Sequence, residues 1–247
     1  MRDLDDYFKN YVEKNFDHIL SDFRKKFEIE IIKKLKPKII LEIGCGLNPL
    51  FLDYENFEYL IIVEPTEGFC KFALEKLDNE YAHLKNRIQI VNKPIQEFKI
   101  ANLQPDFVMC AGLIGEFRDP KEIIDAVYNI CNLETTAYIS APNANSFHRL
   151  LALEAGFIDN VNTLSQEQIK FQRHLVFDRK SISNHVQKSG FKITEIGTYY
   201  VKPFTNLQMI ALLENNIINQ QVLEGLNNMI KYMPNLGAEI YVCVKKE

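Results

Sequence analysis

The feature that most constrains this fold is a regular alternation, after Pro37, of short apolar runs with amphipathic segments. The runs are KIILEI, YLIIVE, RIQIVN, DFVMCAG and AYISAP, and helical patterns separate them. This alternation is typical of βα units, in which parallel strands are covered by helices on both faces. The sequence therefore predicts a doubly wound α/β sheet whose first five strands are parallel.

Helices are predicted before, between and after these runs. Apolar residues three or four apart predict a helix from residue 3 to about 36. Helices are also expected over 66–81, with Thr66 as a possible cap, over 120–131, with Pro120 at its first position, and over 181–188. We thus expect an N-terminal helical cap over 1–36 and one domain over 37–247, with a helical insertion at about 205–234 before the final strand.

Length, charge and cysteine content narrow the class of protein. A chain of 247 residues fits one large domain, and a net charge of −4 argues against a nucleic-acid partner. No apolar run reaches the roughly 18 to 20 residues that a membrane span needs, and the N-terminus is charged. Five cysteines without CxxC spacing predict neither disulfides nor a metal site. We therefore expect a cytoplasmic protein with no membrane partner.

The most informative segment runs from Lys38 to Pro49, where an apolar strand leads into Gly44 and Gly46. Glycines at a strand-to-helix turn let backbone N–H groups approach a ligand closely. Glu64 follows Gly46 by 18 residues, at the end of the second strand. A carboxylate at this place can accept hydrogen bonds from both ribose hydroxyls of a nucleoside. The two features together predict one nucleoside-containing ligand.

Two cofactors fit this pattern, a nicotinamide dinucleotide and S-adenosylmethionine (SAM). A dinucleotide fingerprint requires a third glycine where Pro49 stands. Glu42 lies in an otherwise apolar strand end, where an unpaired carboxylate would cost several kcal/mol. The amino group of SAM would give Glu42 a partner. SAM is therefore favoured, and a nicotinamide oxidoreductase remains an alternative.

ILEIGCGLNP followed by IIVEP resembles the first two motifs of class I SAM-dependent methyltransferases, with Asn48 in place of the family's third glycine. The resemblance covers roughly residues 37–201. It implies a Rossmann-like sheet of seven strands with the last strand antiparallel, SAM as cofactor and S-adenosylhomocysteine as product. The cofactor contacts that it implies in these motifs are Glu42, Gly44, Cys45, Gly46, Asn48, Glu64 and Pro65.

Two later segments extend the resemblance. Residues 88–98 resemble the third strand and the loop that holds adenine, and residues 105–120 are similar to the fourth strand and the loop that meets substrate. The resemblance implies that adenine lies against Pro94, Ile95 and Gln96, and that Ala111, Gly112 and Leu113 line the methyl-transfer channel. Glu116 lies in the loop that meets substrate, at a position where relatives often carry histidine. It is therefore a candidate for binding the acceptor.

The acceptor is predicted to be small and polar. The segments SAPNANSFHR at 140–149 and QRHLVF at 172–177 look like a bacterial subgroup associated with surface-glycan or small-metabolite methylation. This resemblance favours O-methylation of a sugar, nucleotide sugar or phosphorylated metabolite, with polysaccharide biosynthesis as its setting. N-methylation of a small amine, or SAM binding without transferase activity, are the alternatives.

A hydroxyl acceptor requires a base, and His148 and His174 are the candidates because histidine titrates near neutral pH. The candidate acceptor-binding residues are Glu116, Asn143, Asn145, Arg149 and Arg173, of which the arginines could hold a phosphate or carboxylate. Each candidate also has a structural interpretation: His148 as a helix-start residue, His174 as a solvated loop residue, Glu116 as a surface carboxylate, the asparagines as turn residues and the arginines as ion-pair partners. Cys45 is expected to be a small residue beside the cofactor and not a nucleophile. The apolar positions of 207–233 predict core packing or a homodimer interface.

Overall fold

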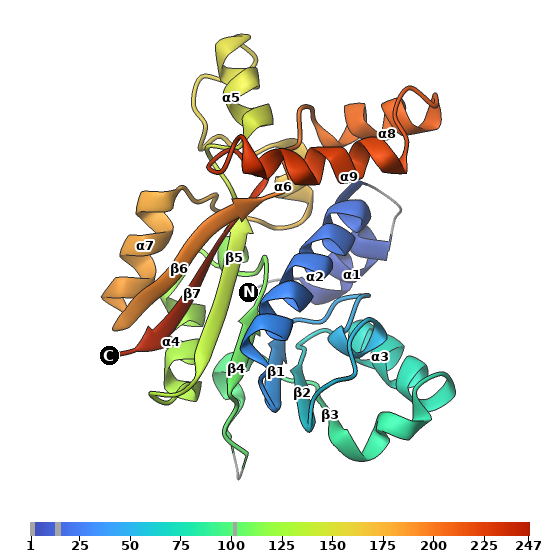
Figure 1. The fold of residues 1–247 in the computed structure, drawn as a ribbon, viewed down its shortest axis with the longest axis vertical. Helices are drawn as coiled ribbons and strands as arrows, with labels where there is room; N and C mark the ends of the chain where they lie inside the picture. The colour runs from blue at the N-terminus through green and yellow to red at the C-terminus, as the bar shows by residue number, and fades with distance from the viewer. Residues whose placement is uncertain (1–2, 13–15, 101–102) are drawn as a thin grey trace.

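The computed structural model describes residues 3–12, 16–100 and 103–247. The described residues form one seven-stranded sheet with the order β3-β2-β1-β4-β5-β7-β6 (Figure 1). The first five strands pair in parallel, and β7 runs antiparallel to both β5 and β6. The predicted α/β fold with an antiparallel last strand is thereby confirmed. The strands are β1 (Ile39–Ile43), β2 (Tyr59–Val63), β3 (Ile88–Val91), β4 (Phe107–Cys110), β5 (Thr136–Pro142), β6 (Phe191–Tyr199) and β7 (Glu239–Lys246).

Helices cover both faces of the sheet. On β1, Ile40 packs in the same core cluster as α2 and α3, whereas Leu41 packs with α4 and α7, because successive side chains of a strand point to opposite faces. The helices are α1 (Leu4–Val12), α2 (Phe16–Leu35), α3 (Glu67–Asn79), α4 (Lys121–Ile130), α5 (Phe147–Glu154), α6 (Gln166–Lys170), α7 (Arg179–Lys188), α8 (Asn206–Glu214) and α9 (Gln220–Asn228).

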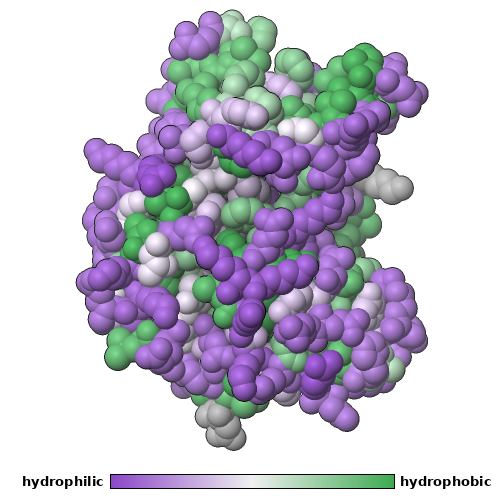
Figure 2. Space-filling view, in the orientation of Figure 1, coloured by the Kyte–Doolittle hydropathy of each residue, from purple (hydrophilic) through white to green (hydrophobic). Residues whose placement is uncertain are grey.

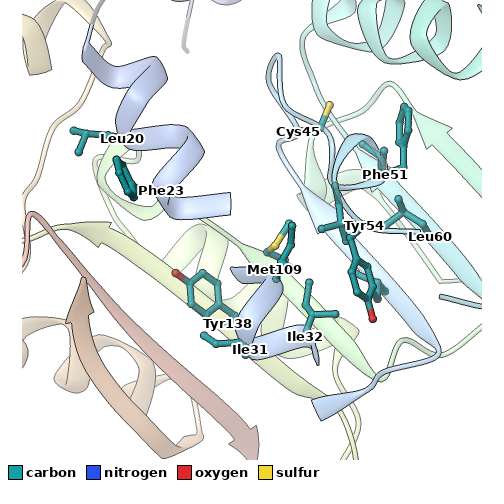
Figure 3. Close-up of a cluster of buried hydrophobic side chains, with 14 of the residues drawn as sticks. Leu20, Phe23, Ile31, Ile32, Cys45, Phe51, Tyr54, Leu60, Met109 and Tyr138 are labelled. Atoms are coloured by element: carbon teal, nitrogen blue, oxygen red, sulfur yellow. The ribbon is translucent and has the colours of Figure 1, made fainter. Parts of the chain in front are cut away.

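The long helix α2 is held on the sheet by apolar packing. Phe23 and Ile32 of α2 are buried in one cluster with Met109 of β4 and Tyr138 of β5 (Figure 3). Burying an apolar side chain of this size contributes about 1.5–3 kcal/mol. This packing fixes α2 beside the carboxyl ends of the parallel strands, where its charged side chains can reach the loops that follow them.

The predicted helical insertion between β6 and β7 consists of two helices, α8 and α9, which lie near α5 at the carboxyl edge of the parallel strands (Figure 1). Asn216, with φ of 55°, follows the end of α8 and breaks the helical run. Met209 and Leu223 are buried in the core, whereas Leu207 is 80% exposed. Apolar side chains also gather over α5 and α8 in the space-filling view (Figure 2). The segment thus carries both core residues and exposed apolar residues.

The helix predicted from residue 3 to about 36 includes residues 13–15, which lie outside the described residues, and α1 and α2 lie on either side of them. Two details differ from the sequence-based expectation. Thr66 precedes α3 but its hydroxyl makes no capping bond, and its backbone N–H donates to Glu64 Oε1 at 2.8 Å. Pro120 occupies the N-cap position of α4, because this helix begins one residue later than predicted, at Lys121. Among the described helices, none has the length and apolar character to cross a membrane.

Candidate functional site

A cavity of about 1140 Å³ opens at the carboxyl edge of the parallel strands. This volume exceeds the roughly 300–1,000 Å³ of a typical small-molecule pocket, so the cavity has room for a cofactor and a second small ligand. All the predicted cofactor-contact residues line it, which are Glu42, Gly44, Cys45, Gly46, Asn48, Glu64, Pro65, Pro94, Ile95, Gln96, Ala111, Gly112 and Leu113. The fold therefore brings four separate strand-end loops to one place.

The loop after β1 requires glycine for conformational and steric reasons. Gly44 and Gly46 have φ values of 72° and 54°, in the left-handed region that disfavours other residues. A Cβ on Gly44 would lie 2.9 Å from Leu113 Cδ1, on the facing loop after β4. The Gly44 N–H donates to Val63 O at 2.9 Å, which ties the loop to the end of β2. The loop is thereby held at the cavity wall, with no side chain of its own at positions 44 and 46.

Glu64 lies at the carboxyl end of β2, 3% exposed, with its carboxylate at the cavity wall. The Thr66 N–H donates to its Oε1 at 2.8 Å, and the Gly46 N–H donates to its Oε2 at 3.4 Å. These backbone donors orient the carboxylate and stabilise its charged form. An oriented carboxylate beside a glycine loop has the chemistry required to bind a ribose diol.

Glu42 has a cationic partner within the protein. Lys25 of α2 donates to Glu42 Oε1 at 2.8 Å, and the Leu50 N–H donates to Oε2 at 2.9 Å. Burial alone would lower the pKa of Lys25, but Glu42 and Glu28 beside it raise that pKa above its ordinary value. The sequence predicted the amino group of SAM as the partner of Glu42, and the structure corrects this, because Lys25 and the Leu50 N–H already bind its two oxygens. Lys25 was not identified from the sequence, because the contact depends on how α2 packs. Lys25 and Glu28, two opposite charges three residues apart among the apolar positions of the predicted helix, are the signal that could have found it.

The N-terminal helix α1 forms a wall of the cavity next to the glycine loop, where a Cβ on Gly46 would lie 3.5 Å from the Tyr11 ring. Tyr7 Oη donates to Glu116 Oε1 at 3.0 Å, and the Tyr11 ring packs edge-on against Phe69 of α3 at 5.3 Å between centroids. Gln172 fastens the start of α1, since its Nε2 donates to Asp3 O at 2.9 Å. An N-terminal helical cap at the acceptor pocket was expected from the sequence, but the residues of this wall were not named, because their contacts require α1 to fold back over the sheet edge.

His174 and Arg173 are the predicted acceptor-side residues that lie at the cavity together with Glu116. The His174 N–H donates to Gly115 O at 2.7 Å, which joins this segment to the loop after β4. The Arg173 guanidinium lies 5.8 Å from the centroid of the Phe171 ring. An imidazole and a guanidinium thus stand next to the loop predicted to line the methyl-transfer channel.

The structure does not bring the other four predicted residues to this cavity. His148 is partly buried, and this burial together with Lys202 and Arg149 lowers its pKa well below the ordinary value. Arg149 donates to the carbonyl oxygens of Val161, at 2.8 Å, and of Thr163, and so fastens the chain after α5. The Asn143 side chain donates to Gly237 O at 2.8 Å and accepts from the Asn145 N–H at 3.0 Å. These contacts explain the four residues by packing and turn formation.

Cys45 lines the cavity between the two glycines of the loop. Burial, with Glu64 and Glu42 nearby, raises the pKa of its thiol well above the ordinary value. The thiol is therefore protonated at neutral pH and is a poor nucleophile.

Comparisons with known proteins agree with this geometry. Among solved structures, the chain resembles a SAM-dependent methyltransferase from Archaeoglobus fulgidus at 17% identity and a TM-score of 0.56, covering 91% of this chain and 94% of that one. It resembles phosphoethanolamine N-methyltransferase 2 of Haemonchus contortus in complex with SAM at 16% identity and a TM-score of 0.57, covering 90% and 52%. The mitomycin 7-O-methyltransferase MmcR is similar at 11% identity and a TM-score of 0.54, covering 99% and 54%.

At these identities the structural neighbours establish the fold. No curated protein matches the sequence. The family described as "Methyltransferase domain" matches residues 11–196, which include β1 to β5 and the glycine loop. Because the match spans most of the chain, the protein belongs to this family of methyltransferase domains.

Proposed function

We propose that the protein is a SAM-dependent methyltransferase that methylates an oxygen of a small polar acceptor, such as a sugar, nucleotide sugar or phosphorylated metabolite. The observation that carries the proposal is that two sets of residues line the same cavity. The Gly44–Gly46 loop and Glu64 form one part of its lining, and Arg173 and His174 form another. Its volume suits two ligands bound side by side.

The cofactor half fits SAM on the chemistry of its lining. Glu64 offers an oriented, buried carboxylate for the ribose hydroxyls, and the glycine loop leaves room for the methionine part. Pro94, Ile95 and Gln96 offer an apolar surface and an amide to adenine. When bound, SAM supplies a methyl group on a positively charged sulfur.

The acceptor half must align the nucleophile and take up its proton. In the transfer, a lone pair on the acceptor oxygen forms the new bond to the methyl carbon, the carbon–sulfur bond breaks, and its electron pair stays on sulfur. In this proposal His174 accepts the proton of the acceptor hydroxyl, and Arg173 holds an anionic group of the acceptor. The closeness of His174 to the loop after β4 supports this role. The resemblance of 172–177 to glycan-associated methyltransferases favours a sugar among the candidates.

A small amine is the second candidate acceptor. Glu116 and the rings of Tyr7 and Tyr11 line the cavity, and a carboxylate with aromatic faces attracts an ammonium group. The structural neighbour from Haemonchus contortus is itself a phosphoethanolamine N-methyltransferase. An amine needs no strong base once it is deprotonated, so the two candidates differ in how much they depend on His174.

Transfer of labelled methyl from SAM to panels of sugars, nucleotide sugars, phosphorylated metabolites and small amines tests this function. For a hydroxyl acceptor, His174→Asn should lower kcat by about 10²–10⁴-fold. His148→Asn is the matched control and should keep kcat, since His148 lies outside the cavity lining. SAM binding with no transfer to any panel member would instead favour a binding protein. Full activity of His174→Asn on a hydroxyl would remove the proposed base.

A further inference from the structure

A buried ionic cluster lies at the floor of the cavity, where α2 faces the sheet. Helix α2 contributes Arg24, Lys25 and Glu28, the end of β1 contributes Glu42, and the start of β7 contributes Glu239. None of these five side chains is more than 15% exposed. Charges this deeply buried must be balanced within the protein or by a ligand, because an unpaired buried charge is costly.

The pairs in this cluster leave one carboxyl group short of a partner. Arg24 pairs with Glu239 at 2.8 Å and Lys25 pairs with Glu42 at 2.8 Å, whereas Glu28 has only a longer contact of 3.6 Å to the same Lys25. Within the described residues, Glu28 Oε1 is buried and makes no hydrogen bond. Three carboxyl groups therefore face two cations, and Glu28 lines the cavity.

The other groups near Glu28 add no positive charge. Tyr138 of β5 and Tyr199 of β6 are buried phenols whose pKa values are raised by burial, so both are neutral near pH 7. Burial, Glu42 and Glu239 raise the pKa of Glu28 to about 7, against the opposing effect of Lys25 and Arg24. The cluster thus stays balanced near neutral pH by holding a proton on Glu28 for part of the time.

We propose that Glu28 receives the ammonium group of the bound cofactor and gives up its proton as that group arrives. The inference rests on the proposed SAM function, and it adds a residue of α2 to the cofactor site. Lys25 contacts both Glu28 and Glu42, and Glu42 stands two residues before Gly44 at the end of β1, so Glu28 belongs to the cofactor half of the cavity. A third cation then matches the three carboxylates.

This exchange makes cofactor binding depend on pH. Below pH 7 the ammonium group must displace a proton from Glu28, which weakens binding by up to about tenfold per pH unit. Well above pH 7 the carboxylate is already free and the dependence disappears.

Calorimetric titration with S-adenosylhomocysteine at pH 7, in buffers of different ionisation enthalpy, counts the protons released. We expect about half a proton per ligand at pH 7 and nearly one at pH 6. The probe 5′-methylthioadenosine has the nucleoside and the sulfur but no amino group, so its binding to the same protein should release none. This comparison uses the unaltered chain and does not depend on the folding of a variant.

Glu28→Gln should bind S-adenosylhomocysteine without releasing protons. The matched control is Glu30→Gln, which removes an exposed carboxylate from the same helix and should release protons as the unaltered chain does. Equal release by Glu28→Gln and the unaltered chain, equal release with both ligands, or proton uptake would overturn the inference. Binding without any release overturns this inference alone, whereas absence of binding overturns the proposed function with it.

Discussion

Replacing Lys25 with methionine removes the cation that ties α2 to the end of β1. Lys25 Nζ lies 2.8 Å from Glu42 and 3.6 Å from Glu28, and both carboxylates are almost fully buried. At an effective dielectric constant of about 20, these contacts correspond to attractions of about 6 kcal/mol for Glu42 and, when Glu28 is ionised, about 5 kcal/mol for Glu28. The desolvation of Lys25 offsets much of this, so the loss is expected to match the about 3–5 kcal/mol typical of a buried pair deprived of one partner.

Urea denaturation followed by circular dichroism measures this loss in the free energy of unfolding. Lys26→Met is the matched control, because its pair with Glu224 is exposed and should contribute less than about 1 kcal/mol. Adding Glu42→Gln to Lys25→Met should recover part of the loss, since it removes a carboxylate that has lost its partner. A loss below about 1 kcal/mol for Lys25→Met would refute the reasoning that this pair anchors α2.

Three further predictions follow from the described contacts. The pKa of Glu28 is raised in the folded protein from 4.5 to about 7. The unaltered chain should therefore lose about 3 kcal/mol of stability relative to Glu28→Gln as the pH rises from about 4.5 to 8. Parallel plots of the free energy of unfolding against pH for the two proteins would contradict this. Gly44→Ala should cost about 1–3 kcal/mol and weaken S-adenosylhomocysteine binding in calorimetry, because of its positive φ and the contact with Leu113. Arg149→Met should lower the melting temperature and leave the affinity for S-adenosylhomocysteine unchanged. Weaker binding of this ligand would mean that Arg149 contributes to the ligand site.

The parts of the site predictable from the sequence are those encoded by local pattern. The glycine turn after β1 and the carboxylate after β2 are set by residues adjacent to their strands, and parallel strands bring their carboxyl ends to one edge. The residues at the cavity from these loops could therefore be named without a structure. The five parallel strands followed from the apolar runs, and the seven-stranded sheet with its antiparallel last strand followed from the resemblance to methyltransferases.

The contacts that were missed depend on the placement of whole helices. Lys25 and Glu28 reach the cavity floor only because α2 packs across the sheet, and no local pattern encodes that register. His148 and His174 each stand next to an arginine and were equivalent in sequence. His148 falls on α5, away from the cavity lining, whereas His174 lies in a segment bonded to the loop after β4. Tertiary packing therefore decides which of two similar motifs meets the ligand.

The central claim is that the Gly44–Gly46 loop and Glu64 bind the nucleoside of SAM. Calorimetric titration with S-adenosylhomocysteine, beside NADH and a Glu64→Ala variant, tests it most directly. We predict micromolar binding of S-adenosylhomocysteine, loss of that binding in Glu64→Ala, and no binding of NADH. Binding of NADH, or no binding of S-adenosylhomocysteine to the unaltered chain, would contradict the account.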